Sequence, residues 1–178
     1  MTKENTNLSG ETSRPTELHR RITARELREK VFVLLFLTGF YEKAEREEMA
    51  WTYLEDLPYT RDVLERIYDR YVLTASKIGT ADPMIGKAAH GWNLRRIGKV
   101  ELNLMRIAVF EIYFDPEIPM QVAINEAVEL GRKYGGENSP AFVNGILSEV
   151  VKNNPTEEVT GAAAAAKDGE ITPDGTAE

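Results

Sequence analysis

The sequence contains no cysteine among its 178 residues, so disulfides, thiolate metal sites and cysteine nucleophiles are excluded. It contains only two histidines, His19 and His90, which lie far apart in the chain. Their separation does not match metal-ligand spacing, and neither forms a recognisable nucleophile–base set with a serine. We interpret both as solvated or helix-capping residues, and we expect no metal site.

A phosphate-binding loop is also missing, although "GTADPMIGKA" resembles one. Six residues rather than four separate Gly79 from Gly86-Lys87, and Ala88 stands where the motif needs Ser or Thr. A glycine-rich dinucleotide fingerprint does not occur either. The sequence therefore predicts a protein without enzymatic activity and without a cofactor.

The chain has no hydrophobic run of transmembrane length. The segment "VFVLLFLTGF" at Val31–Phe40 is far shorter than the roughly 20 residues that span a bilayer. Glu26 and Glu29 interrupt the basic residues before it, which is unlike a secretory signal. We interpret the run as a buried helix, and with the lack of cysteine it favours a cytoplasmic protein with no membrane association.

Charge is distributed unevenly along the chain, whose net charge is −7. Residues 14–30 hold six Lys/Arg against three Glu, whereas residues 155–178 hold one Lys against six acidic residues. Residues 1–17 and 155–178 show no apolar period, which predicts a disordered N-terminal arm and a disordered acidic tail. The folded domain is expected over residues 18–154.

Between these tails the apolar pattern is helical throughout, and it predicts an all-α fold of about seven helices. Thr23 and Glu26 fit a capping box that starts the first helix, which ends near Gly39. The other helices are expected over 43–55, from Thr60 to Gly79, from Asp82-Pro83 to about His90, within Leu94–Phe114, from Pro119 to Gly135-Gly136, and from Ser139-Pro140 onward.

The stretch Leu94–Phe114 predicts a buried central helix, because its apolar side chains point in almost every direction. Arg106 and Glu111 fall within it, and charges there are costly unless they are paired. We interpret these two as structural, salt-bridged residues rather than as a site. Glu101 and Asn103 are polar positions at the start of this helix, and we expect them to mark where it reaches the surface.

Arginines gather at the start of the first helix, in "HRRITARELREK". Arg20 and Arg21 precede the cap, and Arg25 and Arg28 lie one turn apart and face the same way. Cations at a helix N-terminus oppose the helix dipole, so an anionic partner such as nucleic-acid phosphate would offset their cost. The alternative is a solvated basic face diluted by two glutamates, and the charge pattern alone does not separate the two.

The start of the last helix, in "KYGGENSPAFVNG", is a second candidate. Phe142 falls at the edge of the apolar arc, where a half-exposed ring can stack on a base. Ser139 and the first free amides of the helix can meet a phosphate. The alternative is that Phe142 closes the core edge while Asn138 and Ser139 only cap the helix, and taken alone the segment favours this alternative.

Two segments resemble the NusB family of bacterial transcription antitermination factors. "RRITARELREKVFVLLF" is similar to the N-terminal helix of that family. The C-terminal half is closer still to the family pattern of a tryptophan, L-R-x-A-x-x-E, I-P, A-I-N-E-A-V-E-L, a Gly-rich turn and S-x-x-F-V-N-G-x-L. The matching positions are Trp92, Leu104–Glu111, Ile118-Pro119, Ala123–Leu130, Gly135-Gly136 and Ser139–Leu147. The resemblance spans roughly residues 19–152.

The resemblance implies an all-α fold of two packed helical bundles. It also implies binding of boxA RNA, a short single-stranded leader element of ribosomal RNA operons, and of NusE, a small-subunit ribosomal protein, in the RNA polymerase antitermination complex. An alternative is a scaffold that binds NusE and leaves RNA contact to that partner.

Carried over to this sequence, the family's contacts fall on particular residues. The expected NusE contacts are Glu101 and Met120. The expected RNA contacts, with Arg28 added from the arginine cluster, are Arg20, Arg21, Arg25, Arg28, Tyr134, Asn138, Ser139 and Phe142.

The sequence departs from the family pattern at several positions. Ile22 and Thr23 follow Arg20-Arg21 where many members have a third arginine, which lowers the local charge. Asn138 replaces a commonly acidic residue, which favours RNA binding. Val33 or Phe36 stands where a tyrosine is frequent. The methyltransferase domain that follows a NusB-like domain in some rRNA cytosine methyltransferases is not expected here.

Overall fold

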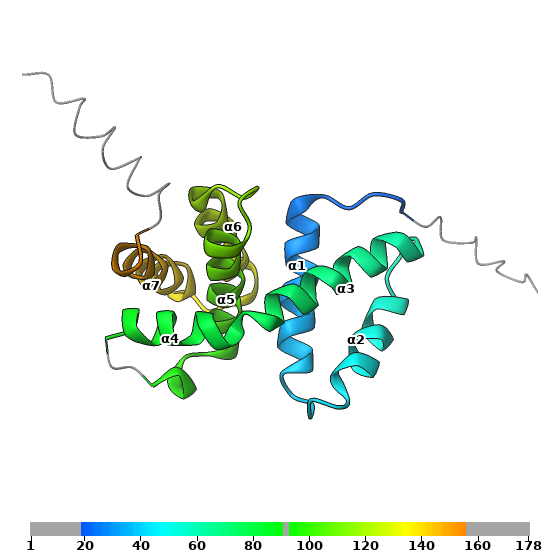
Figure 1. Ribbon diagram of the computed structural model, residues 1–178, viewed down its shortest axis with the longest axis horizontal. Coiled ribbons are helices and arrows are strands. Elements are labelled where there is room, and N and C mark those ends of the chain that lie inside the picture. The colour runs from blue at the N-terminus through cyan, green and yellow to red at the C-terminus, as the bar shows by residue number, and fades with distance from the viewer. Residues whose placement is uncertain (1–18, 91–92, 156–178) are drawn as a thin grey trace, which may run out of the picture.

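Seven α-helices and one 3-10 helix make up the part of the protein that the computed structural model describes, residues 19–90 and 93–155 (Figure 1). The elements are α1 (Ala24–Thr38), α2 (Arg46–Glu55), α3 (Arg61–Ser76), α4 (Ile78–Ala88), η1 (Leu94–Arg96), α5 (Lys99–Phe114), α6 (Met120–Tyr134) and α7 (Ser139–Asn153). The all-α prediction is confirmed. The predicted arm over 1–17, the tail beyond Pro155 and Trp92 lie outside the described residues.

The first helix begins as the sequence predicts. Thr23 is extended, its Oγ1 accepts a hydrogen bond from the Glu26 backbone N at 3.2 Å, and its own backbone N donates to Glu26 Oε2 at 2.9 Å. This reciprocal capping satisfies two N–H groups that the helix leaves without partners. The hydrogen bonds from Thr23 also lower the pKa of Glu26.

The predicted start of the fourth helix is wrong. Helix α4 begins at Ile78, only one residue after α3 ends, so that Pro83 lies inside the helix. Pro83 has no N–H to donate to the preceding turn. Asp82 does not start the helix but accepts hydrogen bonds from Arg106 Nε and Nη2, both at 2.7 Å. His90 follows α4 with φ of +46°, a left-handed conformation that ends helices.

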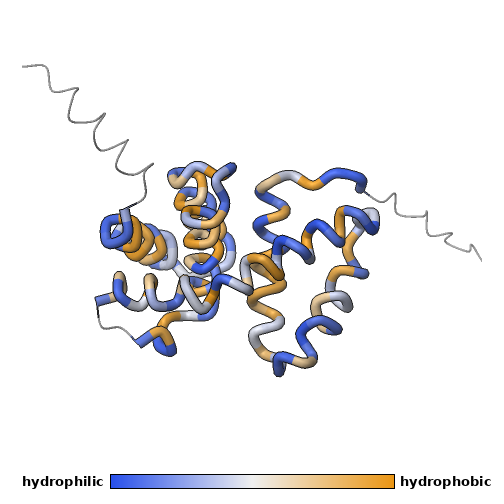
Figure 2. Tube along the Cα trace, in the orientation of Figure 1, coloured by the Kyte–Doolittle hydropathy of each residue, from blue (hydrophilic) through white to orange (hydrophobic). Residues whose placement is uncertain are grey.

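The helices form two halves (Figure 1), with α1, α2 and α3 in one and α4, α6 and α7 in the other. Apolar segments face the interior of each half in Figure 2. Helix α5 serves both halves, since Leu104 and Ile107 join the core of α1–α3 while Met105 and Val109 join the core of α4, α6 and α7. The prediction of two bundles around a buried central helix is confirmed. No helix in the described ranges has the length and apolar character needed to cross a membrane.

Candidate nucleic-acid interface

The arginine-rich segment before α1 is anchored to the α2–α3 turn. The His19 backbone N donates to the Pro58 carbonyl at 2.8 Å, and the Thr60 N donates to the His19 carbonyl at 3.0 Å. Ile22 is buried in the core of the α1–α3 half. Arg20 and Arg21, which lie between these anchors, are both exposed. Their backbone is therefore fixed while their side chains face solvent, as a phosphate contact requires.

Arg25 and Arg28 lie one turn apart on α1, yet their environments are opposite. The Arg25 side chain is 69% exposed, whereas that of Arg28 is 4% exposed. Arg28 Nε donates to both carboxylate oxygens of Glu111 at 2.9 Å, and its Nη1 donates to Glu126 at 3.3 Å. The assignment of Arg28 to the RNA contacts is therefore corrected: this guanidinium is enclosed between the two halves and satisfied by carboxylates.

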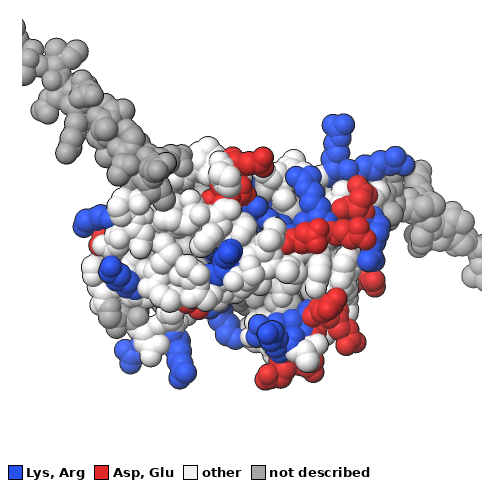
Figure 3. All heavy atoms as spheres, in the orientation of Figure 1, with Lys and Arg blue, Asp and Glu red and all other residues white. Residues whose placement is uncertain are grey.

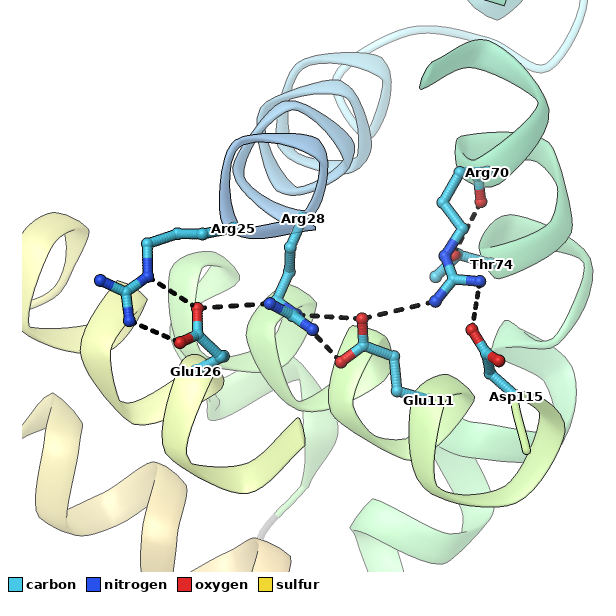
Figure 4. A network of polar contacts seen from close by, with 7 residues as sticks. All are labelled: Arg25, Arg28, Arg70, Thr74, Glu111, Asp115 and Glu126. Carbon is cyan, nitrogen blue, oxygen red and sulfur yellow. Dashed lines mark hydrogen bonds and ion pairs between the residues drawn. The ribbon is translucent and has the colours of Figure 1, made fainter. Parts of the chain in front are cut away.

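The two charges predicted within the central helix are structural, as expected. Glu111 is buried and accepts from Arg28 and also from Arg70 Nη2 at 3.4 Å (Figure 4). Burial raises the pKa of Glu111, although both arginines act against that shift. Arg106 pairs with Asp82. Among the described residues no group of three or more His, Asp or Glu side chains is placed to hold a metal ion.

A groove between α1 and α6 leads away from Arg25. It has a volume of about 330 Å³ and is lined by Arg25, Glu29, Glu126, Glu129, Leu130, Arg132 and Lys133. Lys133 Nζ lies 2.8 Å from Glu29 Oε1, and the Tyr134 hydroxyl donates to the same carboxylate. The Phe32 and Tyr134 rings are 4.9 Å apart. These contacts place the arginine-rich start of α1 beside the helix that leads to the predicted Asn138–Phe142 segment.

The groove adds two cations that the sequence analysis did not single out. Arg132 and Lys133 are exposed in the last turn of α6. In the sequence, the only hint that these two cations belong to the candidate site is that they stand directly before Tyr134. Tyr134 itself is 36% exposed, and burial of its hydroxyl end together with the hydrogen bond to Glu29 raises its pKa.

A second hollow, of about 410 Å³, lies at the start of α7. Its lining residues are Arg96, Ile97, Gly98, Glu101, Gly136, Glu137, Asn138, Ser139 and Phe142. The structure thus brings together three of the predicted RNA contacts. Phe142 is partly exposed and packs against the core of the α4, α6 and α7 half, as its position at the edge of the apolar arc predicts. The hollow also contains an exposed cation, Arg96, that the sequence analysis did not single out. The sequence hints at it only through the consecutive arginines Arg95 and Arg96.

Ser139 does not cap α7 with its side chain, contrary to the prediction. The residue at the cap position is Asn138, which makes no capping hydrogen bond, and buried Ser139 donates its hydroxyl to Glu101 Oε1. A Cβ at Gly98 would overlap the Glu101 carboxylate, and one at Gly135 would overlap Ser139. Glycine is needed at position 135, where a Cβ would also meet the Gly131 carbonyl, whereas the Glu101 carboxylate beside Gly98 is the end of a flexible side chain that can move.

The two predicted NusE contacts do not form one compact patch. Glu101 lies in the first turn of α5, while half-buried Met120 opens α6 just after α5 has ended. A 16-residue helix is about 24 Å long, so they lie near its opposite ends. Asn103 was expected at the surface, but it is 5% exposed and accepts from Arg106 Nη1 at 3.1 Å.

The charge on the face seen in Figure 3 is mixed rather than uniformly basic. On the face seen in Figure 3, most acidic side chains lie over the α1–α3 half, interspersed with Lys and Arg. The other half shows scattered cations and a smaller acidic group at its upper edge, among uncharged groups. This face therefore presents no broad positive surface.

Comparisons with known proteins identify the family and the fold of this chain. The family model for NusB matches residues 25–152. The transcription antitermination protein NusB of Lachnoclostridium phytofermentans is 47% identical over 131 residues, covering 73% of this chain and 99% of the relative. The solved structure of T. maritima NusB superposes with a TM-score of 0.67 at 30% identity and covers 79% of this chain and 99% of that one.

A further solved structure, of the antitermination factors NusB and NusE in complex with dsRNA, has a TM-score of 0.59 at 24% identity. It covers 72% of this chain and 96% of that chain, and at this identity it supports the fold alone.

Proposed function

The chain belongs to the NusB family, and we propose that it is a transcription antitermination factor that binds boxA-type single-stranded RNA of ribosomal RNA operon leaders together with NusE. The observation that carries the RNA part is the α1–α6 groove, which is lined by residues from Arg25 to Lys133. The Tyr134 hydroxyl donates to Glu29 in the wall of this groove. Tyr134 stands only four residues before Asn138, where the second hollow begins. We propose that the RNA contacts both the groove and the hollow, which two separate segments of the sequence supply.

The chemistry of this surface suits a single strand. Arg20 and Arg21 offer exposed guanidinium groups to phosphates, because they are fixed at the backbone and open at their tips. Arg25 adds the N–H groups that its contact with Glu126 leaves unused. Phe142 offers part of a ring face at the start of α7. The Ser139 N–H there already donates to the Gly136 carbonyl at 3.0 Å and Pro140 has no N–H, so the proposed contact at this point rests on the ring. A base can stack on such a ring only when it is not already paired in a duplex.

NusE and the RNA polymerase antitermination complex are the proposed protein partners. The hydrogen bond between Glu101, an expected NusE contact, and Ser139, an expected RNA contact, supports joint binding. A partner that contacts Glu101 would act directly on the hollow that holds Phe142.

The proposal is tested by titrating a boxA-like single strand at several salt concentrations, with and without NusE. The triple variant Arg20→Ala/Arg21→Ala/Arg25→Ala should bind more weakly than the wild type. Its slope of log affinity against log salt should be shallower by about 0.7 for each phosphate contact that is lost.

A matched control removes three exposed cations elsewhere, Arg46, Arg61 and Lys87, and should bind nearly as the wild type does. Weak, sequence-independent binding, or equal losses in both triple variants, would count against the proposed RNA surface. Binding that occurs only when NusE is present, and that ignores the first triple variant, would favour the scaffold alternative.

A further inference from the structure

We propose that Glu126 is a positioning residue of the RNA site, which holds the Arg25 guanidinium in place for a phosphate. This inference rests on the proposed function. Arg25 Nε donates to Glu126 Oε2 at 3.0 Å and its Nη2 donates to Oε1 at 2.6 Å, a bidentate arrangement (Figure 4). The Arg25 side chain is otherwise largely exposed, and Glu126 is its ion-pair partner from a different helix.

The carboxylate of Glu126 is itself held from the buried side. Its side chain is only 16% exposed, and Arg28 Nη1 donates to its Oε2 at 3.3 Å. Arg28 is fixed in turn by both oxygens of Glu111, inside the seam between the two halves. A rigid chain of contacts therefore runs from the interior of the protein to the exposed tip of Arg25.

Two of the three guanidinium nitrogens of Arg25 face Glu126, which leaves Nη1 and the second hydrogen of Nη2 for another acceptor. A free arginine side chain must give up its rotamer freedom when it binds a phosphate. Glu126 has already ordered Arg25 before the RNA arrives, so less is lost on binding. The carboxylate also repels a phosphate, but this open site is screened by water and salt.

Glu129 provides a matched control for charge. It lies three residues further along α6, is 52% exposed, and pairs with Arg132 at 2.9 Å. It contributes a Coulombic attraction to Arg25 that raises the pKa of Arg25, but the largest contribution to that shift is the hydrogen bond that Arg25 donates to Glu126. Glu129→Gln therefore removes a nearby negative charge without removing the contact that orders Arg25.

The test measures the Kd for a boxA-like single strand by fluorescence anisotropy, using the full chain and the variants E126Q, E129Q, R25A and R25A/E126Q. E126Q should weaken binding about three- to tenfold, the effect of releasing one immobilised side chain. E129Q should bind as the wild type does or slightly more tightly. E126Q should have no further effect in the R25A background, and circular dichroism melts should show that each variant is folded.

The variant R25K tests the same contact from the other side, because it leaves Glu126 and its contact with Arg28 intact. Lysine keeps the charge but cannot form the bidentate contact, so R25K should weaken binding about as much as E126Q does. Binding by E126Q that equals or exceeds that of the wild type would overturn the positioning role and make Glu126 a competitor of RNA. An equal loss from E126Q with and without Arg25 would overturn it as well.

The outcomes also separate this inference from the proposed function. Failure of the wild type to bind RNA, or full binding by R25A, overturns the RNA role of Arg25 and the positioning role together. Weakened binding by R25A with unchanged binding by E126Q overturns the positioning role alone.

Discussion

The ion network between the two halves has a buried end and an exposed end, and the two ends differ in what they do. At the buried end, Arg28 and Glu111 are each 4% exposed and satisfy one another between α1 and α5. At the exposed end, the solvent-exposed side chain of Arg25 forms an ion pair with Glu126 (Figure 4). One turn of helix separates the two arginines, so position relative to the seam, not residue type, decides whether an arginine is buried in the fold or open to solvent.

Removal of the buried arginine should give the largest effect on stability. Arg28→Ala leaves the Glu111 carboxylate enclosed with only the longer contact to Arg70, so the free energy of unfolding should fall by about 3–5 kcal/mol. Urea unfolding followed by circular dichroism measures the loss. The double variant Arg28→Met/Glu111→Leu, which replaces both charges by apolar groups, should recover much of it. A loss for Arg28→Ala below about 1 kcal/mol would contradict the buried role.

Local signals predicted most of the fold. The capping box of Thr23 and Glu26 depends on residues three apart, and the all-round apolar pattern of α5 depends on one helix, so both are visible in the sequence. The start of α4 was missed because Asp82-Pro83 has the form of a helix start. The structure uses Asp82 instead as the partner of Arg106, 24 residues away.

The candidate site was less visible in the sequence, because its decisive contacts are distant. Arg28 and Glu111 are 83 residues apart, and Ser139 and Glu101 are 38 apart. A helical wheel places Arg28 near Arg25 but does not show that another helix covers it. The aromatic ring of Phe142 was placed correctly, because exposure at the edge of an apolar arc is a property of a single helix.

Substitution of Phe142 should have an effect of intermediate size, and it separates a role in RNA binding from a role in the core. Phe142→Ala should weaken binding of a boxA-like strand by about 1–3 kcal/mol if the ring stacks a base. Its effect on binding should exceed its effect on thermal stability, since the ring is only partly buried. Anisotropy titrations and thermal melts on the same samples compare the two.

Phe142→Leu is the matched control, because it keeps apolar contact with the core but removes the aromatic face. It should bind RNA nearly as weakly as Phe142→Ala while melting close to the wild type. Wild-type affinity in Phe142→Leu, with a lowered melting temperature in Phe142→Ala, would assign the ring to the core instead.

The smallest expected effect is the pH dependence of the exposed end of the network. The hydrogen bond from Arg25 is the largest influence on the Glu126 carboxyl and lowers its pKa below the usual value of about 4.3. A carboxyl whose pKa is lowered by folding stabilises the protein above the unfolded value, and that contribution is lost as the pH falls through the folded value. Glu126→Gln should therefore be slightly less stable than the wild type at pH 7, by a small fraction of the loss caused by Arg28→Ala.

Urea unfolding of the wild type, Glu126→Gln and Glu129→Gln at pH 7, 5 and 3 measures this difference. The difference in free energy of unfolding between the wild type and Glu126→Gln should persist at pH 5 and narrow toward pH 3. At low pH the wild-type carboxyl is protonated and therefore uncharged, like the amide of the variant. A gap that stays constant over this range would show that the substitution acts through the shape of the contact with Arg28 rather than through charge. The exposed end would then belong with the buried end as a purely structural part of the seam.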